Sequence, residues 1–156
     1  MELTIRDART EDAAVLAAYN SAMAEETEGK SLAPDRIGSG VAKVLADKSR
    51  GRYWVAESGG AVVGQIMVTY EWSDWRNGNL WWIQSVYVHP DWRRRGVFSA
   101  LYRHVESLAK AAPDAVGLRL YVEENNTRAQ RTYEALGMVK PNYLVMQTLF
   151  ADKLLK

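Results

Sequence analysis

Residues 86–101 read VYVHPDWRRRGVFSAL, and this stretch decides the fold. Its first residues favour a strand that Pro90 ends, and apolar residues at 97, 101, 105 and 108 predict one face of a helix. Between strand and helix lie three consecutive arginines and Gly96. Backbone N–H groups at a helix start have no intrahelical partner, and the helix dipole favours negative charge there. The stretch therefore predicts a helix start that can hold a pyrophosphate, although composition by itself favours a solvated basic loop.

Outward from this stretch, the pattern alternates strands and helices. Asn77-Gly78 predicts a two-residue turn between two strands. Thr10 is predicted to cap the first helix, and the polar residues 25–31 to break it. Strands are predicted at residues 4–9, 52–57, 61–72, 80–88, 116–122 and 143–150, and helices after Thr10 and at 34–49, 96–111 and 127–136. This order predicts an α/β fold, a mixed and mostly antiparallel sheet with helices on its faces.

Composition narrows the functional classes. A chain of 156 residues that is 47% hydrophobic and 25% charged is typical of one globular domain, expected to span residues 1–156. A net charge of +1 argues against nucleic-acid or anionic membrane partners. The absence of cysteine excludes disulfides and thiolate chemistry, and two histidines, at 89 and 104, suggest no metal site. Without a signal peptide or an apolar span of ~18 residues, a cytoplasmic location is expected.

A second informative segment, residues 126–138, reads NTRAQRTYEALGM. Asn126, Ala129 and Tyr133 are spaced i, i+3 and i+7, so they share one face of a predicted helix that Gly137 ends. A tyrosine at such a position is usually a core or interface residue. By itself, the segment does not indicate catalysis.

Together, the two segments resemble the GNAT superfamily of N-acetyltransferases, which move an acetyl group from acetyl-CoA to an amine. The family loop Gln/Arg-x-x-Gly-x-Gly/Ala is similar to residues 93–98, which match it at Arg93 and Gly96. The family helix Asn-x-x-Ala-x-x-x-Tyr, ending in Gly-Phe, is similar to residues 126–138. The resemblance covers nearly the whole chain and implies a GNAT-like fold with acetyl-CoA as co-substrate. Because the chain has no cysteine for an acetyl-enzyme, direct transfer in a ternary complex is expected.

The resemblance also implies roles for individual residues. The strand before the arginine loop would hold the pantetheine arm and donate to the oxyanion, and Tyr133 would protonate the leaving thiolate. The implied cofactor-binding residues are Val86, Tyr87, Val88, Arg93, Arg94, Arg95, Gly96, Val97, Phe98, Ser99, Asn126, Ala129 and Tyr133.

Two positions depart from the family pattern. Phe98 stands where the family usually has glycine or alanine. It is expected to point into the interface between helix and sheet, because it begins the apolar face of the helix, and to leave its backbone N–H for the phosphate. Gln84 stands where many members have a glutamate general base. Glutamine cannot take a proton, so the base is expected elsewhere or through water.

The predicted hairpin suggests a replacement base. A two-residue turn at Asn77-Gly78 would place Glu71 opposite Gln84, roughly 5 Å apart at Cβ. Glu71 is then the predicted base, directly or through a water held by Gln84, and an exposed glutamate at a strand end is the alternative. The predicted catalytic residues are Tyr133, Glu71 and Gln84; Glu26 and Glu28 are further candidates because that loop commonly lines the acceptor site in the family.

The predicted function is acetyl transfer to a primary amine of a small molecule or peptide. The alternative is an acyl-CoA-binding sensor without turnover, which Gln84 favours and Tyr133 opposes. Trp72, Trp75, Trp81 and Trp82 crowd the hairpin, where they fit cross-strand packing, an aromatic wall for the acceptor or a homodimer contact.

Overall fold

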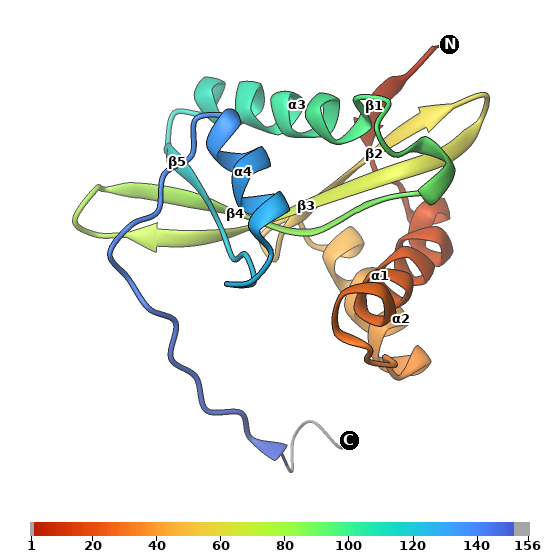
Figure 1. The fold of residues 1–156 in the computed structure, drawn as a ribbon, viewed down its shortest axis with the longest axis horizontal. Coiled ribbons are helices and arrows are strands. Elements are labelled where there is room, and N and C mark those ends of the chain that lie inside the picture. The colour runs from red at the N-terminus through yellow and green to blue at the C-terminus, as the bar shows by residue number, and fades with distance from the viewer. Residues whose placement is uncertain (1, 152–156) are drawn as a thin grey trace. The chain divides into compact units, whose positions relative to one another are not determined.

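The computed structural model describes residues 2–151 of the chain. The chain divides into two compact units, the first ending at Tyr121 and the second beginning at Val122. The second unit holds α4 (Thr127–Ala135). The first unit holds β1 (Thr4–Asp7), η1 (Thr10–Asp12), α1 (Ala13–Glu28), α2 (Pro34–Ala46), β2 (Arg52–Ser58), β3 (Ala61–Ser73), β4 (Gly78–Val88), η2 (Pro90–Trp92), α3 (Val97–Ala111) and β5 (Ala115–Leu120) (Figure 1).

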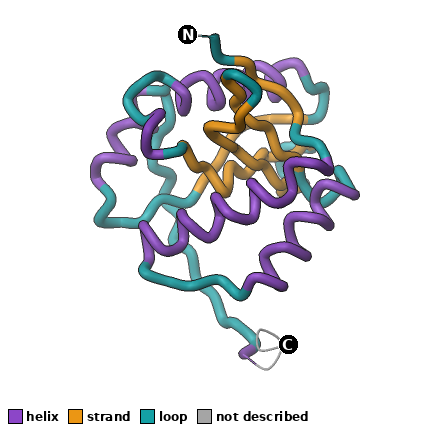
Figure 2. Tube along the Cα trace, turned by 90° about the vertical axis from the view of Figure 1, so that its right-hand side faces the viewer, coloured by secondary structure: helices purple, strands orange, loops and turns teal. Residues whose placement is uncertain are grey.

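The first unit is built on a five-stranded sheet in the order β1-β2-β3-β4-β5. The pairs from β1 to β4 are antiparallel, and β5 pairs with β4 in parallel. Helix α3 covers one face and helices α1 and α2 cover the other (Figure 1), so that the strands lie between helices in the turned view as well (Figure 2). The predicted mixed α/β sheet is confirmed.

Successive side chains of β2 point to opposite faces of the sheet, so this strand contributes to the core on both faces. Tyr53 and Val55 join a buried cluster with Leu16 of α1 and Val41 of α2. Trp54, between them, faces α3, where its ring lies 6.4 Å from that of His104. On the same face, a Cβ at Gly64 would lie 2.9 Å from the Val97 side chain, so glycine there lets α3 approach β3 closely.

The predicted two-residue turn at Asn77-Gly78 is wrong. Ser73 pairs with Gly78, so residues 74–77 form a four-residue turn in which Asn77 has the left-handed φ of 51°. The backbone N–H of Arg76 donates to the carbonyl of Ser73 at 3.2 Å, which closes the longer loop. Gly78 is the first residue of β4 and lies close to β5: a Cβ there would lie 2.4 Å from the side chain of Val116, so only glycine fits without a shift.

Other predicted boundaries also shift. Helix α1 continues through Glu28, into the polar stretch predicted to break it, and ends at Gly29 with a φ of 63°. Thr10 does not cap α1: it begins the short turn η1, in which the Asp12 carboxylate accepts the backbone N–H of Arg9 at 2.6 Å, and no side chain in the described part of the chain caps α1 itself. The strand predicted at residues 143–150 is wrong, since no strand occurs in the described part of the second unit. Alternation provides strand propensity, but a strand also needs a neighbour to bond its backbone.

Within residues 2–151, no helix combines the length and the apolar character needed to cross a membrane.

Candidate active site

Strand β4 carries a β-bulge in the middle of the sheet. Gln65 pairs with Tyr87 and Met67 pairs with Gln84, so Ile66 alone faces the two residues Ser85 and Val86. Ser85 takes a left-handed φ of 51°, which is uncommon for a residue other than glycine. A bulge re-aims the groups of the bulged strand, and bulges are frequent beside active sites. Sequence reasoning missed it, because neither glycine nor proline marks the position.

The loop after β4 leads into a helix start suited to an anion. Gly96 caps α3 with a left-handed φ of 80°, and Arg94 has a φ of 64°. Left-handed residues in such a turn direct successive N–H groups into a concave nest. A Cβ on Gly96 would meet no atom within 4 Å among the described residues, so the space in front of the helix start is open. The predicted strand, loop and helix of residues 86–101 are confirmed.

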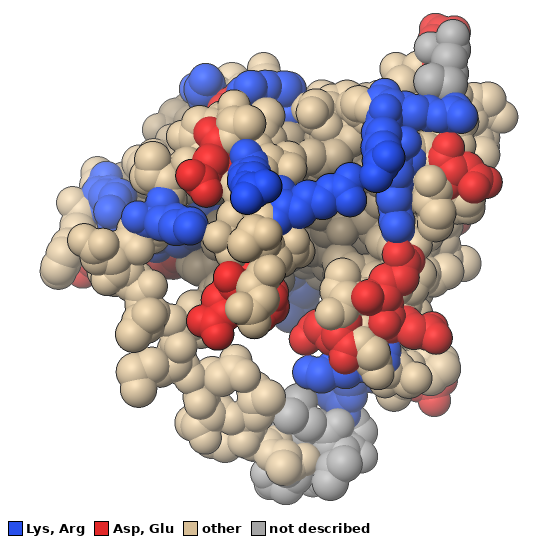
Figure 3. All heavy atoms as spheres, in the orientation of Figure 1, with Lys and Arg blue, Asp and Glu red and all other residues tan. Residues whose placement is uncertain are grey.

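The three arginines of the loop do different things. Arg93 donates from Nε to the carbonyl of Val88 at 3.0 Å and from Nη2 to the carboxylate of Glu26 at 2.8 Å. Arg95 lies over the ring of Trp92, 5.2 Å from its centroid. Arg94 and Arg95 are both exposed. Figure 3 shows basic side chains gathered over this loop, above acidic side chains at the end of α1.

Glu26 ties α1 to β4 as well as to the loop. Its carboxylate accepts a hydrogen bond from the Tyr87 hydroxyl, and the Arg93 guanidinium lies 5.3 Å from the Tyr87 ring centroid. Hydrogen bonds from Tyr87 and then Arg93 lower the pKa of Glu26. Burial and the neighbouring carboxylate raise the pKa of Tyr87. This carboxylate is therefore occupied in a structural network, whose partners are 61 and 67 positions away in the chain.

Phe98 is half-buried in the first turn of α3. Its ring centroid lies 6.1 Å from that of Tyr102, one turn later, and Val97 beside it is buried. The expectation that the ring points into the interface between helix and sheet, away from the phosphate path, stays a prediction. The use of its backbone N–H for a phosphate stays a prediction.

The predicted pairing of Glu71 with Gln84 is wrong. The four-residue turn places Glu71 opposite Leu80 and Gln84 opposite Met67. Gln84 donates from Nε2 to the hydroxyl of Thr69. Glu71 instead accepts from Trp82 Nε1 at 2.5 Å and from Arg119 at 3.0 Å. A role for Glu71 as the general base stays a prediction, but Gln84 does not lie opposite it as that prediction assumed.

The four tryptophans of the hairpin differ in their burial and in their neighbours. Trp81 is buried, 6.3 Å from Trp54 between ring centroids, so cross-strand packing accounts for it. Trp82 lies 4.3 Å from the ring of Tyr121 on β5's continuation. Trp72 and Trp75 are 58% and 88% exposed, so core packing does not account for them.

In the second unit, Asn126, Ala129 and Tyr133 lie at the start and along α4, as predicted. Asn126 caps the helix, because its Oδ1 accepts the backbone N–H of Ala129 at 3.1 Å. Partial burial raises the pKa of the Tyr133 hydroxyl. Sequence reasoning missed Gln130, whose Nε2 donates to the carbonyls of residues 123 and 124 and so fastens the preceding loop.

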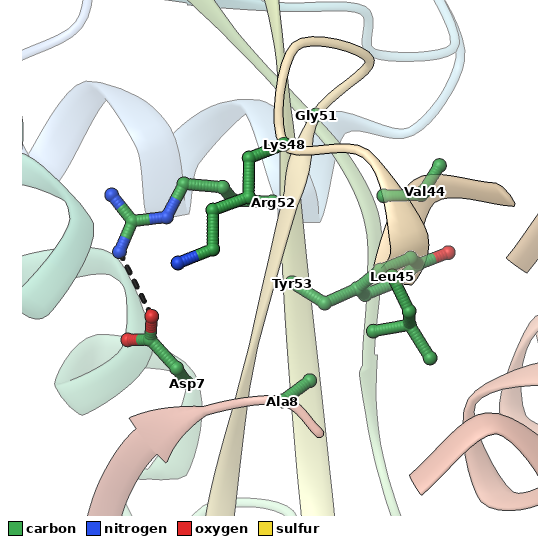
Figure 4. A pocket seen from close by; sticks show the side chains of 8 residues that line it. All are labelled: Asp7, Ala8, Val44, Leu45, Lys48, Gly51, Arg52 and Tyr53. Carbon is green, nitrogen blue, oxygen red and sulfur yellow. Dashed lines mark hydrogen bonds and ion pairs between the residues drawn. The ribbon is translucent and has the colours of Figure 1, made fainter. Parts of the chain in front are cut away.

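A small cavity elsewhere in the first unit does not suit a substrate. Its volume is about 30 Å³, far below the roughly 300–1,000 Å³ of ligand pockets. Figure 4 shows the Arg52 guanidinium reaching Asp7, at 3.0 Å, with Lys48 beside it. The cavity is lined by residues of β1, α2 and β2, away from the loop before α3.

Comparisons with known proteins agree with this geometry. Bovine (Bos taurus) thialysine N-epsilon-acetyltransferase is 33% identical over 79 residues, 51% of this chain and 45% of that protein. The chain spans about half the length of the curated relatives it matches. A possible acetyltransferase from Clostridium difficile 630 has a crystal structure with a TM-score of 0.90 and 43% identity, covering 96% of this chain and 99% of that one.

A Clostridium acetobutylicum protein solved with acetyl-CoA shares the fold, with a TM-score of 0.78 at 15% identity, covering 94% of this chain and 96% of that one. The model of the acetyltransferase (GNAT) family matches residues 15–138. That match includes both segments on which the resemblance was based. The chain belongs to the acetyltransferase (GNAT) family.

Proposed function

We propose that the protein transfers an acetyl group from acetyl-CoA to a primary amine of a small molecule or peptide, directly between the two bound substrates. The observation that carries this proposal is the left-handed Gly96 that opens α3 at the end of the loop after the bulged strand β4. This arrangement places an anion-binding nest after a strand in which a bulge changes the direction of the backbone N–H and C=O groups. Membership of the acetyltransferase family and the similarity to thialysine N-epsilon-acetyltransferase support the reaction class.

The residues present fit acetyl-CoA. The N–H groups of residues 97–99, in the first turn of α3, have no intrahelical acceptor, a Cβ at Gly96 would meet open space, and the exposed Arg94 and Arg95 add positive charge for a pyrophosphate. Residues 86–88 would hold the pantetheine arm along the strand. When bound, acetyl-CoA supplies the thioester that the amine attacks.

The chemistry of the amine depends on Gln84. A lysine-like amine has a pKa of ~10.4, so it is mostly protonated at neutral pH. Because Gln84 uses Nε2 to donate to Thr69, its Oε1 is the end that can accept an N–H of the amine. Gln84 then orients the nucleophile, and solvent takes the proton.

Tyr133 is proposed to return a proton to the thiolate that leaves. An acid must be protonated to act, and partial burial raises the pKa of its hydroxyl, which keeps the proton on it throughout the neutral range. Asn126 and Ala129, on the same helix as Tyr133, are proposed as cofactor-binding residues.

The test begins with thermal unfolding of the protein with and without acetyl-CoA, beside adenosine diphosphate. Ligand at about 100 times its dissociation constant adds about 2.7 kcal/mol to the free energy of unfolding. We expect a clear stabilisation by acetyl-CoA, followed by release of free thiol with a primary amine from a screen that includes lysine-like compounds. The absence of cysteine removes the protein's own thiol signal. No stabilisation by millimolar acetyl-CoA would overturn the proposal, and binding without turnover would favour a sensor.

A further inference from the structure

Gln65 is a fully buried amide in the middle of β3. Its Nε2 donates to the backbone carbonyl of Ser85, in the bulge of β4, at 2.9 Å. The same nitrogen donates to Oδ1 of Asn20, on α1, at 3.1 Å. Both hydrogens of the amide are therefore committed, one to the bulge and one to the helix that covers it.

These contacts determine how the amide is oriented. A backbone carbonyl only accepts hydrogen bonds, so the nitrogen of Gln65 must face Ser85. Asn20 is held in turn, because its Nδ2 donates to the Tyr53 hydroxyl at 3.0 Å. A chain of buried polar groups thus runs from β2 through α1 and β3 to the bulge.

This arrangement is costly for a purely structural element. Oε1 of Gln65 is buried and meets no donor among the described residues. A buried polar atom without a partner is destabilising, and an apolar side chain of similar size would avoid the loss. Ser85 also keeps a left-handed φ of 51° without being glycine, which persists only when surrounding contacts hold it. The buried amide is the contact that reaches its carbonyl.

We propose that Gln65, held by Asn20, is a positioning residue that maintains the bulge at Ser85 and Val86 and thereby the direction of the β4 backbone groups that face the thioester. This inference rests on the proposed function for its catalytic consequence. Its structural half, the dependence of the bulge on Gln65, does not.

The experiment compares Gln65→Met with Val41→Ala. Methionine preserves the volume but donates nothing to Ser85. Val41 is buried in the apolar cluster of α1, α2 and the sheet and makes none of the hydrogen bonds that lead to Ser85, so its truncation provides a control for lost apolar packing. We expect Gln65→Met to lower kcat at least tenfold with the amine KM within twofold, and Val41→Ala to leave both within twofold.

A second variant provides a readout that a stability loss would not produce. In Gln65→Glu, a carboxylate would face two acceptors, whereas the protonated acid can donate to Ser85, and burial raises the pKa of such an acid. We expect its kcat, relative to the wild type, to recover as pH is lowered. A relative kcat that is flat with pH would overturn the inference.

Nuclear magnetic resonance of the ligand-free protein tests the bulge independently of catalysis. The backbone amide signals of Ser85 and Val86 should shift or broaden in Gln65→Met and stay in place in Val41→Ala. Unmoved signals, or a kcat within twofold of the wild type, would overturn the inference. If Gln65→Met does not fold, Asn20→Ala replaces it, with the same shifts expected and their absence equally decisive. If the variants shift the signals of Ser85 and Val86 but the wild-type protein shows no turnover, the proposed function is contradicted and the dependence of the bulge on Gln65 stands.

Discussion

The guanidinium of Arg93 lies 2.8 Å from the carboxylate of Glu26 and joins the loop before α3 to the end of α1. Both side chains are more than a third exposed, so the ion pair alone contributes little stability. Its effect is geometric, because Tyr87 donates to the same carboxylate and Arg93 also donates to the carbonyl of Val88. The strand proposed to hold pantetheine and the loop proposed to hold pyrophosphate thus share one anchor.

Glu26→Ala should weaken acetyl-CoA binding several-fold, because the loop and β4 lose the group that orders them. The free energy of unfolding should change by less than about 1 kcal/mol, as for other exposed pairs. Calorimetric titration with acetyl-CoA measures the first quantity. Glu28→Ala is the matched control, since Glu28 is exposed on the same turn and its partner is Lys30. Equal weakening in both variants would contradict the role of Glu26.

Gly96→Ala should impair the helix start in two ways. The left-handed φ of 80° costs alanine about 1 kcal/mol, and the new methyl group projects into the space proposed for the pyrophosphate. Gly59→Ala, in the turn between β2 and β3, imposes similar strain at a φ of 58° with equally open space. We expect both variants to lose similar stability in denaturant titrations, and only Gly96→Ala to lose acetyl-CoA affinity. Comparable affinity in the two would place the phosphate elsewhere.

Gln84→Glu should supply a general base at the position proposed to accept the amine. The wild-type rate is expected to rise with pH up to the pKa of the acceptor amine, because solvent removes the proton. A carboxylate beside Thr69 should increase kcat/KM at neutral pH by about tenfold or more and move the rising limb to lower pH. A pH–rate profile of both proteins decides this. An unchanged limb would mean that another group already acts as the base.

Glu71→Gln tests whether Glu71 is the general base in the wild-type protein. Its carboxylate is already bonded to Trp82 and Arg119, so we expect the pH–rate profile to keep its shape. Loss of a titrating limb in this variant would restore Glu71 as the base, despite its distance along β3 from the partner of Gln84.

Tyr133→Phe should lower kcat by about a hundredfold while acetyl-CoA binding persists, because only the proton donor is removed. The pKa of Tyr133 is raised, so the protonated, active form dominates below pH ~10 and is lost only above it. The wild-type rate should therefore fall at high alkaline pH, and this falling limb should vanish in the variant. A variant with the full wild-type rate would assign the acid to another group.

Asp12→Ala should reduce stability by about 2 kcal/mol at neutral pH. Asp12 accepts two hydrogen bonds from Arg6, at 2.8 and 3.0 Å, and these bonds first of all lower its pKa. A lowered folded-state pKa means that the stabilisation is present above the unfolded pKa of ~3.9 and is lost as pH falls below it. Denaturant titrations at pH 7 and pH 3 should show the difference between wild type and variant shrinking in acid. A constant difference would assign the effect to packing.

Local interactions let the sequence by itself determine much of this protein. The order of strands and helices, the helix start after Gly96 and the helix that Asn126 caps all depend on periodicity, breakers and capping within a few residues. The same short segments carry the family resemblance, and so the order of residues along the chain is enough to locate the loop of residues 93–98.

Tertiary structure alone decided the features that depend on neighbours distant in the chain. The register that separates Glu71 from Gln84 follows from the four-residue turn at residues 74–77, because the length of the turn determines which residues of β3 and β4 lie opposite each other. The bulge at Ser85 exists where Gln65 reaches its carbonyl from β3, and Asn20 of α1 holds Gln65 in turn. Glu26 acquires its role from Tyr87 and Arg93, more than sixty positions away. Packing between elements selects these contacts, and no local pattern encodes them.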